Sequence, residues 1–343
     1  NFGDVRFDRG VGKFINHARN NLEAIVLNTS LNGHYIQNDN TKWEWGMKLQ
    51  KEEITDHIKE WTLIDSAGFT LPHASDNING NSDTTQELLM TEFLKTYLKL
   101  SSFRESGFIQ YNKDIGNFTI NAGTRASYWS FNKEFLFSPR LNLAFIPLWE
   151  KDVVFRAATG IYYQSPFYRE LRNLEGELNP NIESQKSIHF VLGSDYLFYS
   201  WGRPFKLISE IYYKDLQNLI PYKVDNVRIQ YLAENNSNGY ATGADLKING
   251  EFVTGVESWA SLSVMQTMED IEDDFYIDEE TGETIYPGFI PRPTDQRVNF
   301  SLFFQDYLPG NPNYKMHLSM MYGTGLSFGP PNSDKYQDIL RMP

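Results

Sequence analysis

The chain has 343 residues with 31 basic and 44 acidic side chains, so its formal net charge is −13. An acidic chain lacks the basic surface that neutralises phosphates, which argues against a nucleic-acid partner. It has no cysteine, which excludes disulfides, thiol catalysis and thiolate metal sites. No apolar stretch approaches the roughly 18 residues of a membrane-spanning helix. A membrane β-barrel remains compatible with this composition, because its strands are apolar on one face only.

Apolar and polar residues alternate along most of the chain, which is typical of strands with one apolar and one polar face. Residues 118–130 are the clearest case, with apolar residues at most even positions and polar ones at most odd positions. Most of these segments exceed the roughly 5–6 residues of a typical strand and reach the roughly 9–11 of a tilted bilayer-spanning one. The pattern predicts about 13 strands, at 1–7, 22–37, 42–56, 93–112, 117–130, 135–146, 152–164, 186–200, 205–221, 240–252, 256–268, 295–307 and 314–324.

The predicted connections alternate between short and long. The short ones are Asn38–Thr41, Lys113–Gly116, Pro147–Lys151, Trp201–Pro204, Val253–Gly255 and Leu308–Asn313. The long, polar ones are His57–Glu92, Ser165–Gln185, Pro221–Gly239 and Glu269–Thr294, and the short link Asn132–Glu134 is an exception. Short turns on one rim, long loops on the other and aromatic residues near strand ends are typical of outer-membrane barrels. The sequence therefore predicts an all-β, antiparallel transmembrane β-barrel.

Seven charged residues lie in the middle of predicted strands, opposite apolar neighbours. A charge on the lipid face of a barrel costs about 2–4 kcal/mol at the bilayer midplane, so these residues are predicted to face the lumen. There we expect ion pairs with each other more than direct contact with a substrate. The seven are Arg125, Arg156, Asp195, Glu210, Lys214, Asp245 and Lys247.

The segment from Glu269 to Glu283 holds nine acidic residues and no basic one. Carboxylates at this density suggest a weak Ca²⁺ candidate at Asp273, Asp274 and Asp278. The spacing does not match an EF-hand loop, so a solvated, self-repelling loop is the preferred interpretation. No HExxH or GxSxG motif is present either, and we expect neither a resident metal or cofactor nor an enzyme.

The chain begins at Asn1 without a basic and apolar leader, and it ends after a loop rich in Gly, Pro and Asp. Neither end is typical of a natural terminus, so we expect a piece of a longer protein.

Several segments resemble TonB-dependent receptors of the Bacteroidota, in the same order along the chain. They are Phe137–Phe145 (FSPRLNLAF), Phe155–Leu171 (FRAATGIYYQSPFYREL), Gln185–Phe198 (QKSIHFVLGSDYLF), Pro291–Pro309 (PRPTDQRVNFSLFFQDYLP), Glu60–Gly68 (EWTLIDSAG) and the tail Tyr322–Pro343.

The resemblance implies an active transporter in the outer membrane of a Gram-negative bacterium that imports a siderophore, glycan, peptide or vitamin. Such receptors have about 22 strands around a plug. The plug precedes the barrel and carries the TonB box, which links it to the energy-transducing complex; some relatives also work with a surface lipoprotein. Residues 1–343 would then be an incomplete barrel domain lacking both plug and closing strand. Trp61, Phe167 and Tyr168 are candidates for stacking on a ligand, or for packing the loops alone.

Two other functions fit parts of the pattern. A passive porin-type channel shares every barrel feature, and the presence of a plug would separate the two. A soluble carbohydrate-binding or hydrolytic protein fits the aromatic content of 15%. It does not explain why loop lengths alternate.

Overall fold

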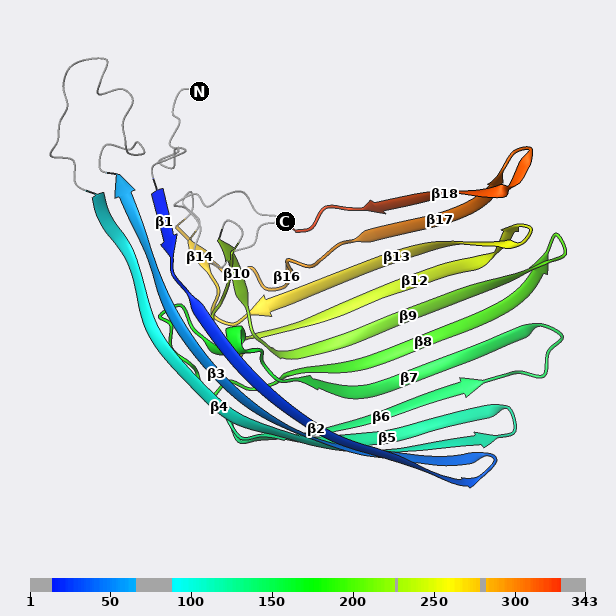
Figure 1. The fold of residues 1–343 in the computed structure, drawn as a ribbon, viewed down its shortest axis with the longest axis horizontal. Helices are drawn as coiled ribbons and strands as arrows, with labels where there is room; N and C mark the ends of the chain where they lie inside the picture. Colours follow the sequence, from blue (N-terminus) through cyan, green and yellow to red (C-terminus); the bar gives the residue numbers. More distant parts are fainter. Residues whose placement is uncertain (1–13, 66–87, 226–227, 278–281, 328–343) are drawn as a thin grey trace, which may run out of the picture.

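The computed structural model of the chain describes residues 14–65, 88–225, 228–277 and 282–327 (Figure 1). Apart from one 3-10 helix, η1 (Tyr168–Leu171), the regular structure of these residues is strand. None of their helices is long and apolar enough to cross a membrane. The strand predicted at 1–7 lies outside the described residues.

Strands from β1 to β18 form one antiparallel sheet of 14 strands in the order β1-β3-β4-β5-β6-β7-β8-β9-β12-β13-β17-β18, with β2 on β3 and β16 on β13. This confirms the all-β, antiparallel prediction. The bounds are β1 Phe14–Ala18, β2 Asn21–Asn38, β3 Thr41–Asp65, β4 Leu88–Ile115, β5 Phe118–Trp129, β6 Glu134–Phe145, β7 Asp152–Gln164, β8 Gln185–Ser200, β9 Arg203–Leu219, β12 Ser237–Val253, β13 Val256–Ile271, β16 Ile290–Pro291, β17 Val298–Leu308 and β18 Asn311–Gly323. Two small hairpins stand apart, β10 (Tyr222–Asp225) with β11 (Arg228–Tyr231) and β14 (Tyr276–Ile277) with β15 (Thr284–Ile285).

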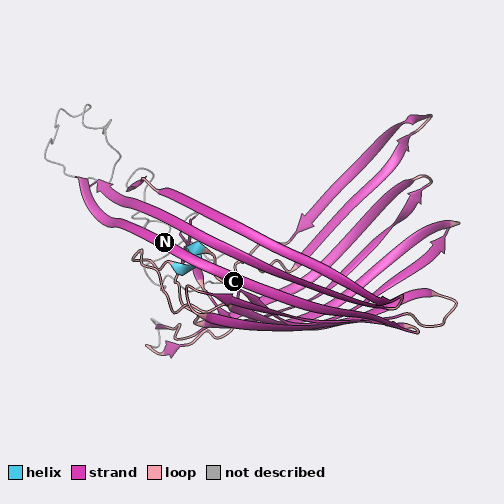
Figure 2. Ribbon diagram, turned by 60° about the horizontal axis from the view of Figure 1, so that its bottom comes forward, coloured by secondary structure: helices cyan, strands magenta, loops and turns pink. Residues whose placement is uncertain are grey.

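The sheet is strongly curved and open, with β2 at one edge and β18 at the other (Figures 1 and 2). β1 and β2 pair with successive parts of β3, so they form one strand interrupted at Arg19 and Asn20. The interruption is held together by the Arg19 amide, which donates to the Lys59 carbonyl at 2.8 Å. Among the described residues β2 and β18 do not pair with each other, so the sheet does not close into a barrel.

The short connections fall at one end of the sheet and the long ones at the other, as predicted. Trp201 and Gly202 form the β8–β9 turn with φ of 52° and 68°. Positive φ at both central residues is the geometry that matches the twist of a two-residue hairpin. β3 and β4 run further than predicted, to Asp65 and from Leu88, because the sequence alone did not show where their pairing stops.

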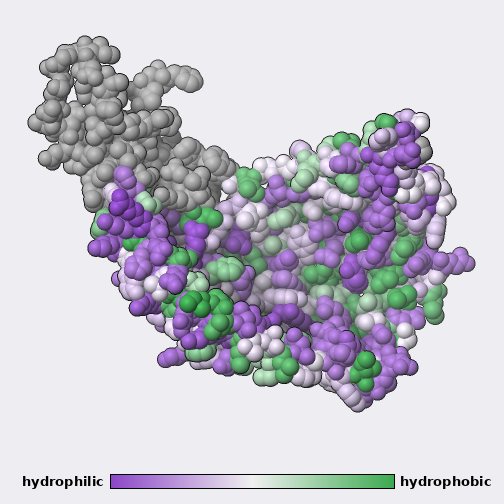
Figure 3. Space-filling view, viewed as in Figure 1, coloured by the Kyte–Doolittle hydropathy of each residue, from purple (hydrophilic) through white to green (hydrophobic). Residues whose placement is uncertain are grey.

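The two faces of the sheet differ in chemistry. One face, here called the outer face, exposes large apolar side chains such as Phe137, Leu192 and Leu318, which are 54%, 57% and 58% exposed. The other, the inner face, carries the mid-strand charges, and residues 165–184 and 220–236 pack against it. Figure 3 looks into the hollow, where hydrophilic side chains lie among hydrophobic ones. An apolar band on one face only is the arrangement of a barrel in lipid.

Candidate functional site

Two of the long connections, residues 165–184 and 220–236, pack together on the inner face, at the end of the sheet opposite the short turns. Their buried centre, here called the loop core, comprises Leu100, Trp129, Leu171, Ile182, Ile220 and Ala233. Leu100 and Trp129 come from β4 and β5, and the others come from residues 165–184 and 220–236. Two loops far apart in sequence therefore share one small hydrophobic core with the sheet.

Polar contacts fix this arrangement. The Tyr168 hydroxyl donates to Asp56 Oδ2 at 2.9 Å, and Arg172 Nη1 pairs with the same oxygen at 3.1 Å. The Asn179 side chain donates to the Ala233 carbonyl at 2.8 Å. Because the carboxylate of Asp56 is only 5% exposed, the two donors from the loop offset the cost of burying it.

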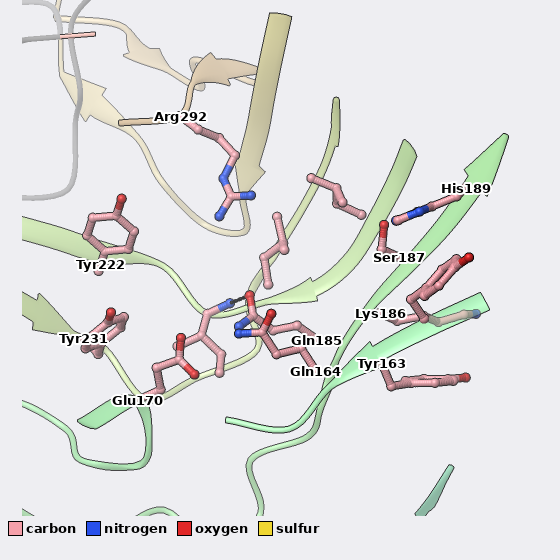
Figure 4. A pocket seen from close by; sticks show the side chains of 14 residues that line it. Tyr163, Gln164, Glu170, Gln185, Lys186, Ser187, His189, Tyr222, Tyr231 and Arg292 are labelled. Carbon is pink, nitrogen blue, oxygen red and sulfur yellow. Dashed lines mark hydrogen bonds between the residues drawn. The ribbon is translucent and has the colours of Figure 1, made fainter. Parts of the chain in front are cut away.

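A cavity of about 430 Å³ lies beside the loop core (Figure 4). Arg292, which directly follows β16, reaches into it from one side, and Glu170 of η1 lies on the opposite side. Tyr222 and Tyr231 of the β10–β11 hairpin line one end, and His189 of β8 lines the other. The volume is within the range of about 300–1,000 Å³ that is usual for small-molecule sites.

The protein holds both Arg292 and Glu170 in place. Arg292 Nε lies 3.2 Å from Glu269 Oε2, and burial lowers the pKa of Arg292. Glu170 Oε2 accepts from the Phe167 amide at 2.8 Å. Burial raises the pKa of Glu170 despite this bond and one from Gln185. The cavity therefore offers a cation, a carboxyl and phenol groups that can hydrogen-bond to or stack on a polar ligand.

The register places all seven predicted lumen charges on the inner face. Arg156 opposes Gly193, and Asp245 opposes both Glu210 and Ser263. The complete set on this face is Arg125, Arg156, Asp195, Glu210, Lys214, Asp245 and Lys247. That this face lines a lumen stays a prediction.

Asp195 is the centre of the one ion-pair group among these seven in the part of the chain that the structure describes. Its carboxylate binds Arg156 Nη2 at 2.6 Å and Lys206 Nζ at 2.8 Å. Lys214 and Lys247 instead place their ammonium groups 5.1 Å and 5.4 Å from the rings of Tyr212 and Trp259. The expected network of ion pairs is therefore local rather than continuous.

The three aromatic ligand candidates have different surroundings. The placement of Trp61 in a loop was wrong, because β3 continues past it and its ring stacks on His17 at 4.9 Å. Phe167 is in the 165–184 connection and is 63% exposed. Tyr168 packs against the loop core through its ring and binds Asp56 through its hydroxyl. Contact of any of them with a ligand stays a prediction.

The acidic run does not assemble a metal site within the described residues, where no three acidic or histidine side chains lie close enough to hold an ion. Asp273 is exposed with φ of 61°, Asp274 is 8% exposed, and Asp278 lies outside the described residues. Burial, followed by the charge of Asp270, raises the pKa of Asp274.

Sequence reasoning missed several charged residues that line the two cavities, among them Glu170 and Arg292 in the first and Lys48, Arg104 and Arg140 in a second. Glu170 and Arg292 lie in or next to connections, where alternation gives no signal. Arg140 lies in a strand but directly follows a proline, which interrupts the alternation. Lys48 and Arg104 do sit on the polar face of alternating segments, so a search for every inner-face charge would have found them.

A protein-family profile described as "TonB dependent receptor-like, beta-barrel" matches residues 4–339. No curated protein sequence matches. Among solved structures, the FrpB iron transporter from Neisseria meningitidis is similar with a TM-score of 0.54 and 12% identity, over 87% of this chain and 42% of that one. The outer membrane transporter YddB from Escherichia coli has a TM-score of 0.51 and 10% identity, over 90% and 47%.

A structure of the RagAB peptide transporter matches with a TM-score of 0.50 and 10% identity, over 84% of this chain and 40% of that one. The chain thus spans less than half the length of these three structures. At such identities the likeness shows the fold alone, whereas the family profile covers nearly the whole sequence. The chain belongs to the TonB-dependent receptor-like β-barrel family.

Proposed function

We propose that this chain is the larger part of the barrel wall of an outer-membrane TonB-dependent transporter of the Bacteroidota. The whole protein imports a scarce nutrient, namely a siderophore, glycan, peptide or vitamin. A plug domain outside this chain fills the lumen and connects to the TonB complex, and further strands close the barrel. The family match over residues 4–339 carries the proposal.

The structure supports this assignment in two ways. The outer face is apolar where lipid would cover it, and the inner face is charged where a plug and a solute would lie. The long connections at one end enclose a cavity, which suits capture of a solute before transport. Capture must precede energy-driven import, because the barrel wall itself supplies no driving force.

Three measurements, of location, orientation and TonB dependence, test the proposal in the native bacterium. The first is the location and size of the protein, from separated membranes blotted with antibody to residues 165–184. We expect an outer-membrane band far above 39.8 kDa, the mass of this chain. A band near that mass would leave no room for a plug and would favour a passive channel, and a soluble band would refute the barrel.

The second measurement is orientation. An epitope tag inserted after Leu174 in the long connection should be accessible to antibody on intact cells. A matched tag inserted after Trp201, in the short β8–β9 turn, should be accessible only after the outer membrane is permeabilised. Import of the nutrient should stop when the TonB gene is deleted.

A further inference from the structure

A second cavity, of about 330 Å³, lies on the inner face across β3 to β6. Each of these four successive strands contributes one cation to its lining. They are Lys48, Arg104, Arg125 and Arg140, here called the basic cluster. Such a gathering is notable in a chain with a net charge of −13.

Small residues leave the space between these cations. The register aligns Lys48, Ser106 and Ser127 across β3 to β5, and aligns Arg125 with Ser138. The hydroxyl groups add donors and acceptors between the charges, and Arg125 Nη2 already donates to Ser106 Oγ at 2.9 Å. A pocket with several cations and hydroxyls is chemically suited to an anion.

Arg104 is committed to the protein. It pairs with Glu52 at 3.1 Å, lies 3.8 Å above the Trp129 ring and donates to the Pro166 carbonyl at 3.2 Å. This last bond holds the start of the 165–184 connection against the cavity. Because Glu52 compensates the charge of Arg104, this arginine is not part of the proposed ligand site.

The other three cations carry the site. Among the ion pairs of the described residues, none includes Lys48, Arg125 or Arg140. Arg140 lies 4.3 Å above the ring of Tyr162. The one acidic residue in the lining, Glu105, opposes Tyr128, so its side chain belongs to the outer face. Three like charges around one hollow are unfavourable until an anion joins them.

The position of the cavity favours a solute as that anion. Ser165 and Tyr163 line it beneath the long connections, and Tyr163 also lines the first cavity. Tyr162 lines the first cavity and lies under Arg140 of the second. The two cavities are therefore neighbours, and a solute that entered between the loops would meet the basic cluster next.

We propose that Lys48, Arg125 and Arg140 form an anion-binding site that holds a small solute bearing several carboxylates or a phosphate. The role of this site, which is to bind the solute on its way through the barrel, rests on the proposed function. The guanidinium forks of Arg125 and Arg140 match planar carboxylate and phosphate groups, and Lys48 adds a point charge.

The test is calorimetric binding to the purified full-length receptor in detergent, with citrate and inorganic phosphate as separate probes and glucose as the neutral comparison. We expect one of the two anions to bind and glucose not to. The triple variant Lys48→Gln/Arg125→Gln/Arg140→Gln should raise the Kd at least tenfold. The matched control Lys247→Gln, on the same face but outside the cavity, should change it less than twofold. If the triple variant does not fold, the single variant Arg140→Gln replaces it, with an expected threefold rise or more.

Failure has distinct signatures. If neither anion binds, or if the variants bind as wild type does, the site is refuted. If the variants leave anion binding unchanged and instead expose the plug to added protease, the basic cluster docks the plug, which also refutes it. Binding to purified protein needs no TonB, so TonB-independent uptake with intact anion binding would overturn the transport proposal and leave the site standing.

Discussion

The loop core makes one sharp prediction, because one of its members is a fully buried leucine that belongs to a loop. Leu171 is 0% exposed and belongs to the 165–184 connection. Replacing a fully buried leucine by alanine removes its transfer free energy and leaves a cavity, at a cost of about 3–5 kcal/mol. Taking about 3 kcal/mol as the loss in the free energy of opening the loop, the open population of Leu171→Ala should rise about a hundredfold.

Hydrogen exchange measures this directly. The full-length receptor in outer-membrane vesicles is exchanged into D₂O and the peptide spanning 165–184 is followed by mass spectrometry. Its protected amides should exchange about a hundred times faster in Leu171→Ala, and the centres of β7 and β8 should exchange as in wild type. The matched control is Leu174→Ala, because Leu174 is in the same loop but 39% exposed.

We expect the control to accelerate exchange by less than about fivefold, since substitutions away from buried contacts cost about 0.5 kcal/mol or less. Unchanged exchange in Leu171→Ala would show that the loop is not held by its core. Equal acceleration in both variants would show that any change in this loop opens it. Either result would refute the reasoning from burial.

Three other predictions concern the loops and the two faces. Tyr168→Phe removes the hydrogen bond to Asp56 and should lower the free energy of opening the loop by about 1.5–3 kcal/mol. The same exchange experiment measures this, and exchange at the wild-type rate would show that the bond does not stabilise the closed loop. Because burial raises the pKa of Glu170, the folded loop binds its proton more tightly than the open loop does, so loop stability should fall as pH rises from the ordinary glutamate pKa through the raised one. Glu170→Gln should flatten that dependence in exchange measured across the same pH range, and an unaltered slope would assign it to another group. Leu192→Arg on the outer face should cost about 2–4 kcal/mol of unfolding free energy in lipid vesicles. Val191→Arg, its neighbour on the inner face, should cost less, and the reverse order would exchange the two faces.

The strands and their faces followed from the sequence. Residues 118–130 were predicted as a strand from alternation, and β5 spans Phe118–Trp129. Alternation is a local property with a period of two, so it also fixes which residues share a face. Between the charged positions the strands pair without a register shift, since the one shift between β9 and β12 lies near Ser237 and Gly239. The division into two faces therefore continues from strand to strand, and seven charges from five strands share one face.

The loops needed the tertiary structure. Tyr168 and Asp56 are 112 residues apart, and no periodicity links them. Nothing in the sequence around Leu171 predicts that it is buried, because the residues that cover it, Ile220 and Ala233, belong to the 220–236 segment. The end of β3 beyond Trp61 depended on where β4 stopped pairing, which neither strand encodes alone.

The alternation in the sequence was sufficient to predict most of the strands, their two faces and the rim from which the long connections leave. Only the fold shows how residues 165–184 and 220–236 pack on the inner face, where the two cavities lie and which cations line the second one. The physical reason is the range of the interactions. Backbone pairing and alternation act between neighbouring residues, whereas a cavity is the space left by side chains that only the fold brings together.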